Sequence, residues 1–177
     1  MKSLNNKSGN VFWITGLSGS GKSNIGKKIL PKIKKKFGPT ILIHGDDLRS
    51  IFKINSYEKK ERLKIGKKYA NFCKFIAKQK INVIFTVVGL FHDLHKYNRK
   101  IIPNYFEIFI KSDIKKLIKN KDKFFYKKQT KNVWGMDLKP EFPKKPDVII
   151  FNKFDKDINK LSNKLIEQIY KIYEKKK

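Results

Sequence analysis

The chain has 177 residues, 40% of them hydrophobic, and this length and composition are typical of one globular domain with a sizeable core rather than a disordered chain. No apolar run approaches the ~20 residues of a membrane span, and residues 1–8 lack the apolar segment of a secretory signal. Cys73 is the only cysteine, so no internal disulfide can form. We therefore expect a cytoplasmic protein that does not bind a membrane.

The formal net charge is +28 at pH 7, which ordinarily suggests nucleic acid as a partner. The excess lysines, however, are spread over every predicted helix and form no single stripe. The chain is also rich in Ile, Asn, Phe and Tyr, which together with Lys indicates an AT-rich coding sequence. We expect no specific nucleic acid as a partner, and a nucleic-acid-binding protein stays as the alternative from another functional class.

Strands and helices alternate along the chain, which predicts an α/β fold with a parallel sheet. A β-branched and aromatic run at 11–15 predicts a buried strand, and a helix follows at 24–36. Residues 121–146 are basic, aromatic and proline-containing without clear periodicity, and their length favours a functional lid. The other predicted strands are 40–43, 81–88, 105–110 and 147–151, and the other predicted helices are 56–78 (capped by Ser56), 93–100, 112–119 and 155–174.

A glycine-rich stretch lies between the first strand and the first helix and fits the phosphate-binding pattern G-x-x-x-x-G-K-[ST]. Glycines let the backbone approach phosphate oxygens closely, and the N–H groups and dipole of the helix favour an anion. Lys22 is expected to bridge the β- and γ-phosphates, and the Ser23 hydroxyl to bind Mg²⁺. We predict ATP and Mg²⁺ as cofactors, a P-loop NTPase-type five-stranded sheet with helices on both faces, and an ATP site formed by Gly16, Leu17, Ser18, Gly19, Ser20, Gly21, Lys22 and Ser23.

Two carboxylates follow the second predicted strand, at the edge where ligands of parallel α/β sheets gather. A carboxylate at this place can orient Mg²⁺ or accept the proton of an attacking hydroxyl. We predict Asp46 as the catalytic base and metal partner beside Lys22, with Asp47 as a reserve that also contacts substrate. A helix cap is the alternative role for this pair.

Only three of the 43 basic residues are arginines, so each arginine marks a place where a planar, bidentate donor is useful. Arg49, just after the carboxylates, can clamp an anionic acceptor, and we include Arg62 among the substrate-binding residues. Phe91 and His92 follow the third strand, with Arg99 expected within reach. These three side chains predict an aromatic and cationic acceptor pocket, although for His92 alone a surface role is an equal alternative.

The ordered motifs resemble the adenylyl-sulfate (APS) kinase family, which phosphorylates the 3′-hydroxyl of a nucleotide on a P-loop fold. Residues 12–23 nearly match its opening motif, and Gly45-Asp46-Asp47-Leu48-Arg49 matches its acceptor-side motif. The stretch 126–128 is similar to part of the family's lid, and 135–146 follows its Gly-Ile-Asp and proline-spaced segment. The resemblance covers about 11–151 in a single kinase domain over 1–177, and it implies Lys127, Lys128 and Trp134 as lid residues that bind substrate. Dimers are common in the family, so a homodimer is one open alternative.

The acceptor side departs from the family's pattern. His44-Gly45-Asp46 stands where the family usually has Asp-Gly-Asp, and 61–66 lacks its Asn-Ile-Arg-Arg pattern. Val88 to His92 replaces its Ser-Pro-Phe/Tyr-Arg loop, so a histidine replaces an expected arginine. Donor residues are kept while acceptor residues differ, which suggests the same reaction on another small nucleotide. Relatives in capsule phosphoramidate pathways phosphorylate cytidine diphosphoramidate, which we take as the expected acceptor, with adenylyl sulfate as the alternative.

Overall fold

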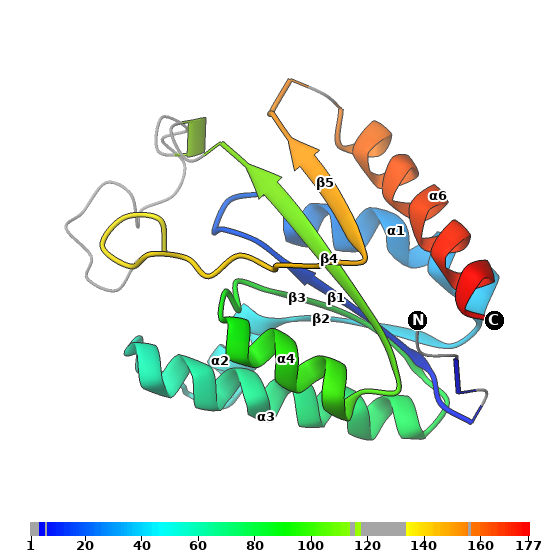
Figure 1. Cartoon of the computed structure of the whole chain (residues 1–177), viewed down its shortest axis with the longest axis horizontal. Helices are drawn as coiled ribbons and strands as arrows, with labels where there is room; N and C mark the ends of the chain where they lie inside the picture. The colour runs from blue at the N-terminus through cyan, green and yellow to red at the C-terminus, as the bar shows by residue number, and fades with distance from the viewer. Residues whose placement is uncertain (1–3, 6, 114–115, 118–133, 156) are drawn as a thin grey trace.

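The structure is a computed structural model that describes the chain apart from residues 1–3, 6, 114–115, 118–133 and 156. Strands and helices alternate through most of it (Figure 1). Residues 114–115 and 118–119 of the helix predicted at 112–119 lie outside the described residues, as do residues 121–133 of the predicted lid. In chain order the elements are β1 Asn10–Thr15, α1 Lys22–Phe37, β2 Thr40–His44, α2 Gly45–Ile51, α3 Lys59–Lys78, β3 Asn82–Val87, α4 His92–Ile101, β4 Asn104–Ser112, β5 Val148–Asn152 and α6 Ile158–Lys176.

The described strands form a five-stranded sheet in the order β2-β3-β1-β4-β5, and every pairing is parallel. Strand β1 lies in the middle, and all six of its residues are buried. A central strand has both faces covered by helices, so it needs apolar side chains on successive residues instead of an alternating pattern. The predicted parallel sheet is confirmed.

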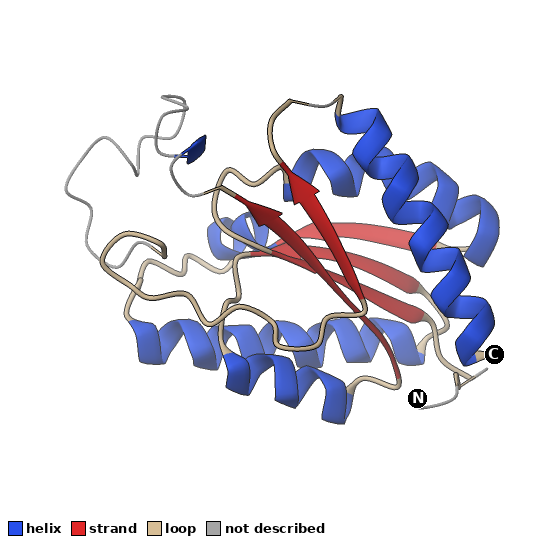
Figure 2. Cartoon of the chain, turned by 45° about the horizontal axis from the view of Figure 1, so that its top comes forward, coloured by secondary structure: helices blue, strands red, loops and turns tan. Residues whose placement is uncertain are grey.

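Helices cover both faces of the sheet, as the sequence predicts (Figure 2). Because successive side chains of a strand point to opposite faces, Val11 and Trp13 of β1 join the core beneath α3 and α4. Phe12 and Ile14 join the core beneath α1 and α6. One continuous apolar strand thus contributes to two separate hydrophobic clusters.

Helices α3 and α4 pack closely because Gly66 removes a side chain from their contact. A Cβ at this glycine would lie 2.7 Å from Cδ2 of Leu94, which is itself fully buried. Cys73 of α3 is also fully buried in this cluster, and burial raises the pKa of its thiol. Its place in the core agrees with a packing role for the single cysteine.

The structure differs from the sequence prediction at two helix starts. Residues 45–51 form the short helix α2 directly after β2, where the sequence analysis assigned a motif but no helix. Ser56 does not cap α3, because that helix begins at Lys59 with Glu58 in the N-cap position. The backbone carbonyl of Ser56 instead accepts a hydrogen bond from Arg49, so residues 52–58 close back onto α2.

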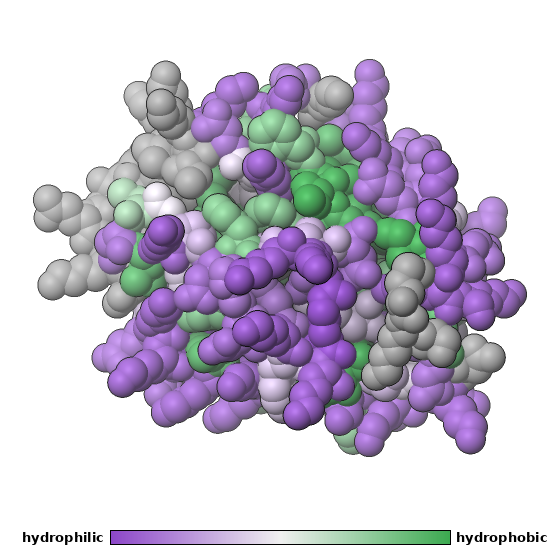
Figure 3. Space-filling view, viewed as in Figure 1, coloured by the Kyte–Doolittle hydropathy of each residue, from purple (hydrophilic) through white to green (hydrophobic). Residues whose placement is uncertain are grey.

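Hydrophilic side chains cover much of the face shown in Figure 3, and hydrophobic residues gather over the region of β4 and β5. On strand β5, Ile149 is 51% exposed and Phe151 is 44% exposed. Within the described part of the chain, no helix is long and apolar enough to cross a membrane.

Candidate active site

The glycine-rich loop joins the carboxyl end of β1 to the start of α1 (Figure 1). Gly19 and Gly21 have φ angles of 77° and 92°, a region that favours glycine because other residues meet steric strain there. Ser20 is fully buried, and its hydroxyl has no hydrogen-bond partner among the described residues. The backbone therefore has the tight curvature that a phosphate-binding loop requires.

Lys22 and Ser23 begin helix α1. The ammonium group of Lys22 lies 2.7 Å from the backbone carbonyl oxygen of Leu17, so its side chain folds back over the loop. The Ser23 side chain is exposed at the helix start. Helix α1 has no acidic residue in its first turn, so the helix itself places no carboxylate at the positive end of its dipole. This arrangement favours a bound anion with several negative charges.

Asn152 supports the loop from behind, and the sequence analysis missed it. Its side-chain amide donates a hydrogen bond of 3.1 Å to the carbonyl oxygen of Ser20, and its amide oxygen accepts one of 3.0 Å from Phe154. A Cβ at Gly21 would lie 3.0 Å from the same amide nitrogen. Strand β5 thus holds the phosphate loop in place. The available signal was a polar amide at the carboxyl end of an otherwise apolar strand.

Asp46 and Asp47 lie in the first turn of α2, and both are exposed. Neither occupies the N-cap position, which belongs to His44. The His44 ring is held at 2.7 Å from the Thr86 hydroxyl on the neighbouring strand β3. Gly45 fits closely against β3 as well, since a Cβ there would lie 3.1 Å from Val87. These contacts fix the direction in which α2 leaves the sheet.

The residues around the loop fit Mg²⁺. A serine hydroxyl and exposed carboxylates are hard oxygen donors, which Mg²⁺ prefers, and Mg²⁺ commonly uses one or two protein ligands beside phosphates and waters. The described residues contain no group of three or more His, Cys, Asp or Glu side chains that could enclose a metal ion. Ser23 and Asp46 are therefore residues that could hold Mg²⁺ together with a bound triphosphate.

Arg49 of α2 and Arg62 of α3 converge on one aromatic ring. Their guanidinium carbons lie 4.3 Å and 5.1 Å from the ring centroid of Tyr57. Burial, and then the charge of Arg49, lowers the pKa of Arg62. The buried Nε of Arg49 has no hydrogen-bond partner among the described residues. Two neighbouring cations with an unused donor favour an anionic ligand.

Phe91 and His92 lie at the start of α4, where Phe91 contacts Trp134 and His92 contacts Glu141 and Phe142. The Phe91 and Trp134 rings meet edge-on, with centroids 4.9 Å apart and an interplanar angle of 87°. Trp134 is only 5% exposed, so its ring packs inward. The backbone N–H of His92 donates to the Glu141 carboxylate at 2.9 Å, and its ring Nε2 donates to the Phe142 carbonyl at 3.0 Å.

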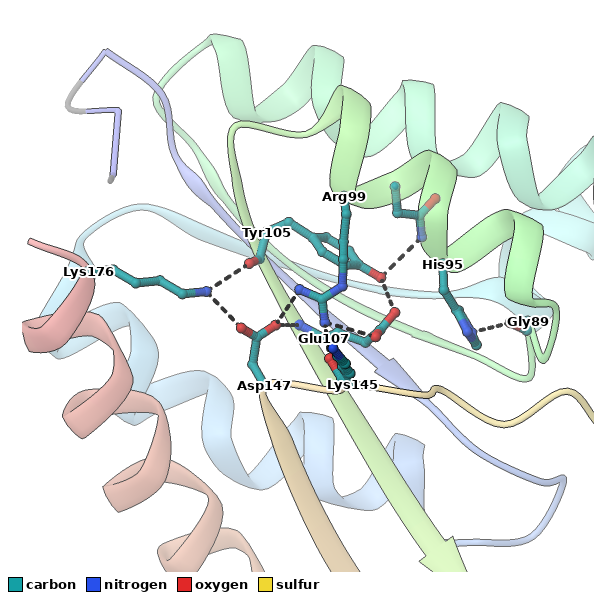
Figure 4. A network of polar contacts seen from close by, with 9 residues as sticks. Gly89, His95, Arg99, Tyr105, Glu107, Lys145, Asp147 and Lys176 are labelled. Atoms are coloured by element: carbon teal, nitrogen blue, oxygen red, sulfur yellow. Dashed lines mark hydrogen bonds and ion pairs between the residues drawn. The ribbon is translucent and has the colours of Figure 1, made fainter. Parts of the chain in front are cut away.

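Arg99 does not join these residues, because it lies two turns further along α4 (Figure 4). It donates to the Glu107 carboxylate at 2.9 Å and pairs with Asp147 at 3.3 Å, while Lys176 pairs with Asp147 at 2.8 Å. Burial of Glu107 raises the pKa of its carboxyl despite the Arg99 charge. The network joins α4, β4, the start of β5 and α6. We therefore do not keep Arg99 in the acceptor pocket.

Lys127 and Lys128, predicted to bind substrate from the lid, lie outside the described residues. Trp134 and the following segment up to Pro146 are described. Gly135 turns the chain with a φ of 87° and donates to the Leu138 carbonyl at 2.9 Å. Of the predicted lid, the structure therefore places only the part that follows residue 133.

Comparison with known proteins identifies the family. The family model described as adenylylsulphate kinase matches residues 8–151. The chain belongs to this family. It is 36% identical over 169 residues to the cytidine diphosphoramidate kinase of Campylobacter jejuni subsp. jejuni serotype O:2, covering 93% of this chain and 95% of that protein. It is 26% identical to an adenylyl-sulfate kinase of Clostridium kluyveri, covering 91% of this chain and 83% of that protein.

The fold agrees with the same family. The structure of the Mycobacterium tuberculosis APS kinase in complex with AMPPNP and APS matches with a TM-score of 0.82, covering 92% of this chain and 98% of that one. Its sequence identity is 22%, so this likeness shows the shared P-loop kinase fold alone. As a member of the family, the protein is a kinase that transfers a phosphoryl group to a hydroxyl acceptor, with ATP implied as the donor.

Proposed function

We propose that the protein is an ATP- and Mg²⁺-dependent kinase that phosphorylates the 3′-hydroxyl of cytidine diphosphoramidate in capsule phosphoramidate biosynthesis. The observation that carries the proposal is the placement of a carboxylate and an arginine on α2, at the same sheet edge as the phosphate loop. One strand, β3, separates β2 from β1, so the two sites lie roughly 10 Å apart. The γ-phosphoryl group and the acceptor hydroxyl would fill this space.

On the donor side, residues 16–23 would hold the triphosphate of ATP. Lys22 would neutralise charge between the β- and γ-phosphates, and Ser23 and Asp46 would hold Mg²⁺. Bound Mg²⁺ supplies charge neutralisation on the phosphate oxygens. The folded-back Lys22 and the exposed Ser23 at the start of α1 support this assignment.

On the acceptor side, Asp46 would accept the proton of the attacking 3′-hydroxyl, with Asp47 as the alternative base. The hydroxyl oxygen forms a bond to the γ-phosphorus, the bond between the γ-phosphorus and the bridging oxygen breaks, and ADP leaves. Arg49 and Arg62 would bind the acceptor's anionic diphosphate, since planar guanidinium groups match phosphate oxygens in pairs. The Nε of Arg49, which has no hydrogen-bond partner within the described part of the chain, supports this role.

Phe91, His92 and Trp134 would form the aromatic wall of the acceptor site. Phe91 contacts Trp134 and the His92 ring donates to the Phe142 carbonyl, so both residues are joined to the segment 134–142, which supports a common pocket. Lys127 and Lys128 would contribute cations from the lid at 121–146, within one kinase domain over 1–177. A lid of this kind limits wasteful ATP hydrolysis because it excludes water.

The choice of cytidine diphosphoramidate over adenylyl sulfate rests on sequence likeness. The relative named cytidine diphosphoramidate kinase is 36% identical over nearly its full length, whereas the adenylyl-sulfate kinase of Clostridium kluyveri is 26% identical. Both acceptors present a ribose hydroxyl and an anionic group, so the arginine pair suits either. Adenylyl sulfate therefore stays as the alternative substrate.

A coupled assay of ADP release, with ATP, Mg²⁺ and the two acceptors in parallel, tests the proposal. Fast turnover of cytidine diphosphoramidate alone is the expected result. Fast turnover of adenylyl sulfate alone would identify a conventional APS kinase, and silence with both would overturn the acceptor assignment. Lys22→Ala is the control, because it should abolish activity with either acceptor.

The alternative from another class, nucleic-acid binding through the +28 charge, predicts tight association that weakens steeply with salt. Only weak, nonspecific association is expected of the kinase, measured by titration of a labelled duplex and a labelled single strand at two salt concentrations. A cytoplasmic location and a homodimer stay predictions, which fractionation and sedimentation analysis would check.

A further inference from the structure

Glu141 links three parts of the acceptor side through its carboxylate and its backbone. One carboxylate oxygen accepts a hydrogen bond of 2.9 Å from the backbone N–H of His92. The other lies 3.1 Å from the ammonium group of Lys59 at the start of α3. The backbone N–H of Glu141 donates to the carbonyl oxygen of Leu90 at 3.2 Å. A residue from the segment before β5 therefore joins the loop between β3 and α4 to helix α3.

The hydrogen bond to His92 has the geometry of a helix cap supplied from a distant segment. Phe91 occupies the N-cap position of α4 and has no side chain that can accept a hydrogen bond. The first N–H groups of a helix need such an acceptor, and a carboxylate at this end also interacts favourably with the helix dipole. The hydrogen bond from the His92 backbone is the main cause that lowers the pKa of Glu141, with the Lys59 charge acting in the same direction.

Two further contacts flank this cap. The Phe91 ring meets Trp134, and the His92 ring donates to the Phe142 carbonyl. The loop of 89–92 and the segment of 134–142 are thus joined at several points. Because exposed ion pairs contribute little and Lys59 is about half exposed, the cap is the stronger of the two carboxylate contacts.

We infer that Glu141 is a positioning residue of the acceptor side: it holds the loop of 89–92, and with it Phe91 and His92, in the orientation that receives the acceptor. Glu141 acts through His92 and Leu90 and does not touch the reacting atoms. The inference rests on the proposed function, because it concerns the pocket that function assigns to the acceptor. ATP binding at residues 16–23 does not involve these contacts.

The kinetic test compares Glu141→Leu, Glu141→Gln and Lys59→Met with wild type. Glu141→Leu removes both carboxylate contacts and should raise KM for the acceptor about tenfold, with KM for ATP unchanged. Glu141→Gln keeps an oxygen that can accept from His92 and should raise the acceptor KM about threefold, and Lys59→Met should have the smallest effect. Glu174→Gln is the matched control, because Glu174 pairs with the exposed Lys36 on another face.

A second measurement is independent of the acceptor. Hydrogen exchange of the backbone N–H groups at 90–95 should be faster in Glu141→Leu than in wild type, with exchange in β1 and α1 unchanged. An acceptor KM equal to that of the control would overturn the inference, as would equal increases in the KM values of both substrates. If wild type shows no turnover with either acceptor, the proposed function fails, and the exchange measurement alone tests the positioning role of Glu141. Unchanged exchange at 90–95 then overturns that role, and faster local exchange supports it.

Discussion

Asn152→Asp tests whether the end of β5 holds the phosphate loop. The substitution keeps the side-chain oxygen that accepts a hydrogen bond from Phe154 but removes the N–H group that donates to the Ser20 carbonyl. A carboxylate oxygen then replaces the donor, 3.1 Å from that carbonyl oxygen, and the two oxygens repel each other. The site is 5% exposed, so water cannot replace the lost donor. Leaving a buried acceptor unsatisfied costs about 1–3 kcal/mol. With about 2 kcal/mol lost at pH 7, Tm should fall by roughly 4–8 °C for a chain of this length.

ATP binding should weaken together with stability, because the displaced Ser20 carbonyl belongs to the loop that is proposed to bind the triphosphate. We expect KM for ATP to rise by about tenfold, which corresponds to ~1.4 kcal/mol of lost binding, with KM for the acceptor little changed. The assay combines thermal unfolding with ADP release at varied ATP. Asn163→Asp is the matched control, since Asn163 is an exposed residue of α6 that accepts a hydrogen bond only from Lys32 among the contacts described here. A Tm and an ATP KM equal to those of this control would refute the supporting role.

Three further predictions concern the base, the acceptor cation and pH. Asp46→Asn should lower kcat by about 10²–10⁴ with modest loss of ATP-analogue binding, and near-normal turnover would remove Asp46 as the base. Arg49→Lys should raise the acceptor KM several-fold because bidentate geometry is lost, and an unchanged KM would argue against an anion site there. Burial lowers the pKa of His95 to about 4. The neutral imidazole therefore contributes its full stabilisation of the folded protein above the unfolded pKa of ~6.5, and this stabilisation is lost as the pH falls toward 4. Denaturant unfolding should show that the free energy of unfolding falls by about 2–3 kcal/mol over that pH range in wild type and by less in His95→Gln. Identical pH profiles of the two proteins would contradict this expectation.

The donor half of the site was predictable because its signals are local. The curvature of the loop depends on glycines at fixed spacing, and Gly19 and Gly21 adopt the positive φ angles that this spacing implies. The strand before the loop is buried at every position and apolar from Val11 to Ile14, which is the pattern of a strand covered on both faces. Here neighbours in the chain are also neighbours in space.

The acceptor half was only partly predictable, because its contacts join segments far apart in the chain. Arg99 is close in sequence to His92, yet the helix carries it two turns away into an ion-pair network with Glu107 and Asp147. Glu141 was visible only as part of a proline-spaced segment, whereas its capping bond reaches His92, 49 residues earlier. Tyr57 carried no sequence signal, although Arg49 and Arg62 both stack on its ring.

The sequence by itself determined the parallel α/β sheet, the phosphate loop and the carboxylates after the second strand. Periodicity, turn chemistry and helix dipoles depend on residues that are close together in the chain, so they can be recognised from the sequence. Only the tertiary structure decided which residues support these elements: Asn152 behind the loop, Glu141 at the start of α4, and Arg49 beside Arg62. Those pairings depend on how strands of different sequence position are ordered in the sheet and how helices pack on it. No local pattern encodes that arrangement.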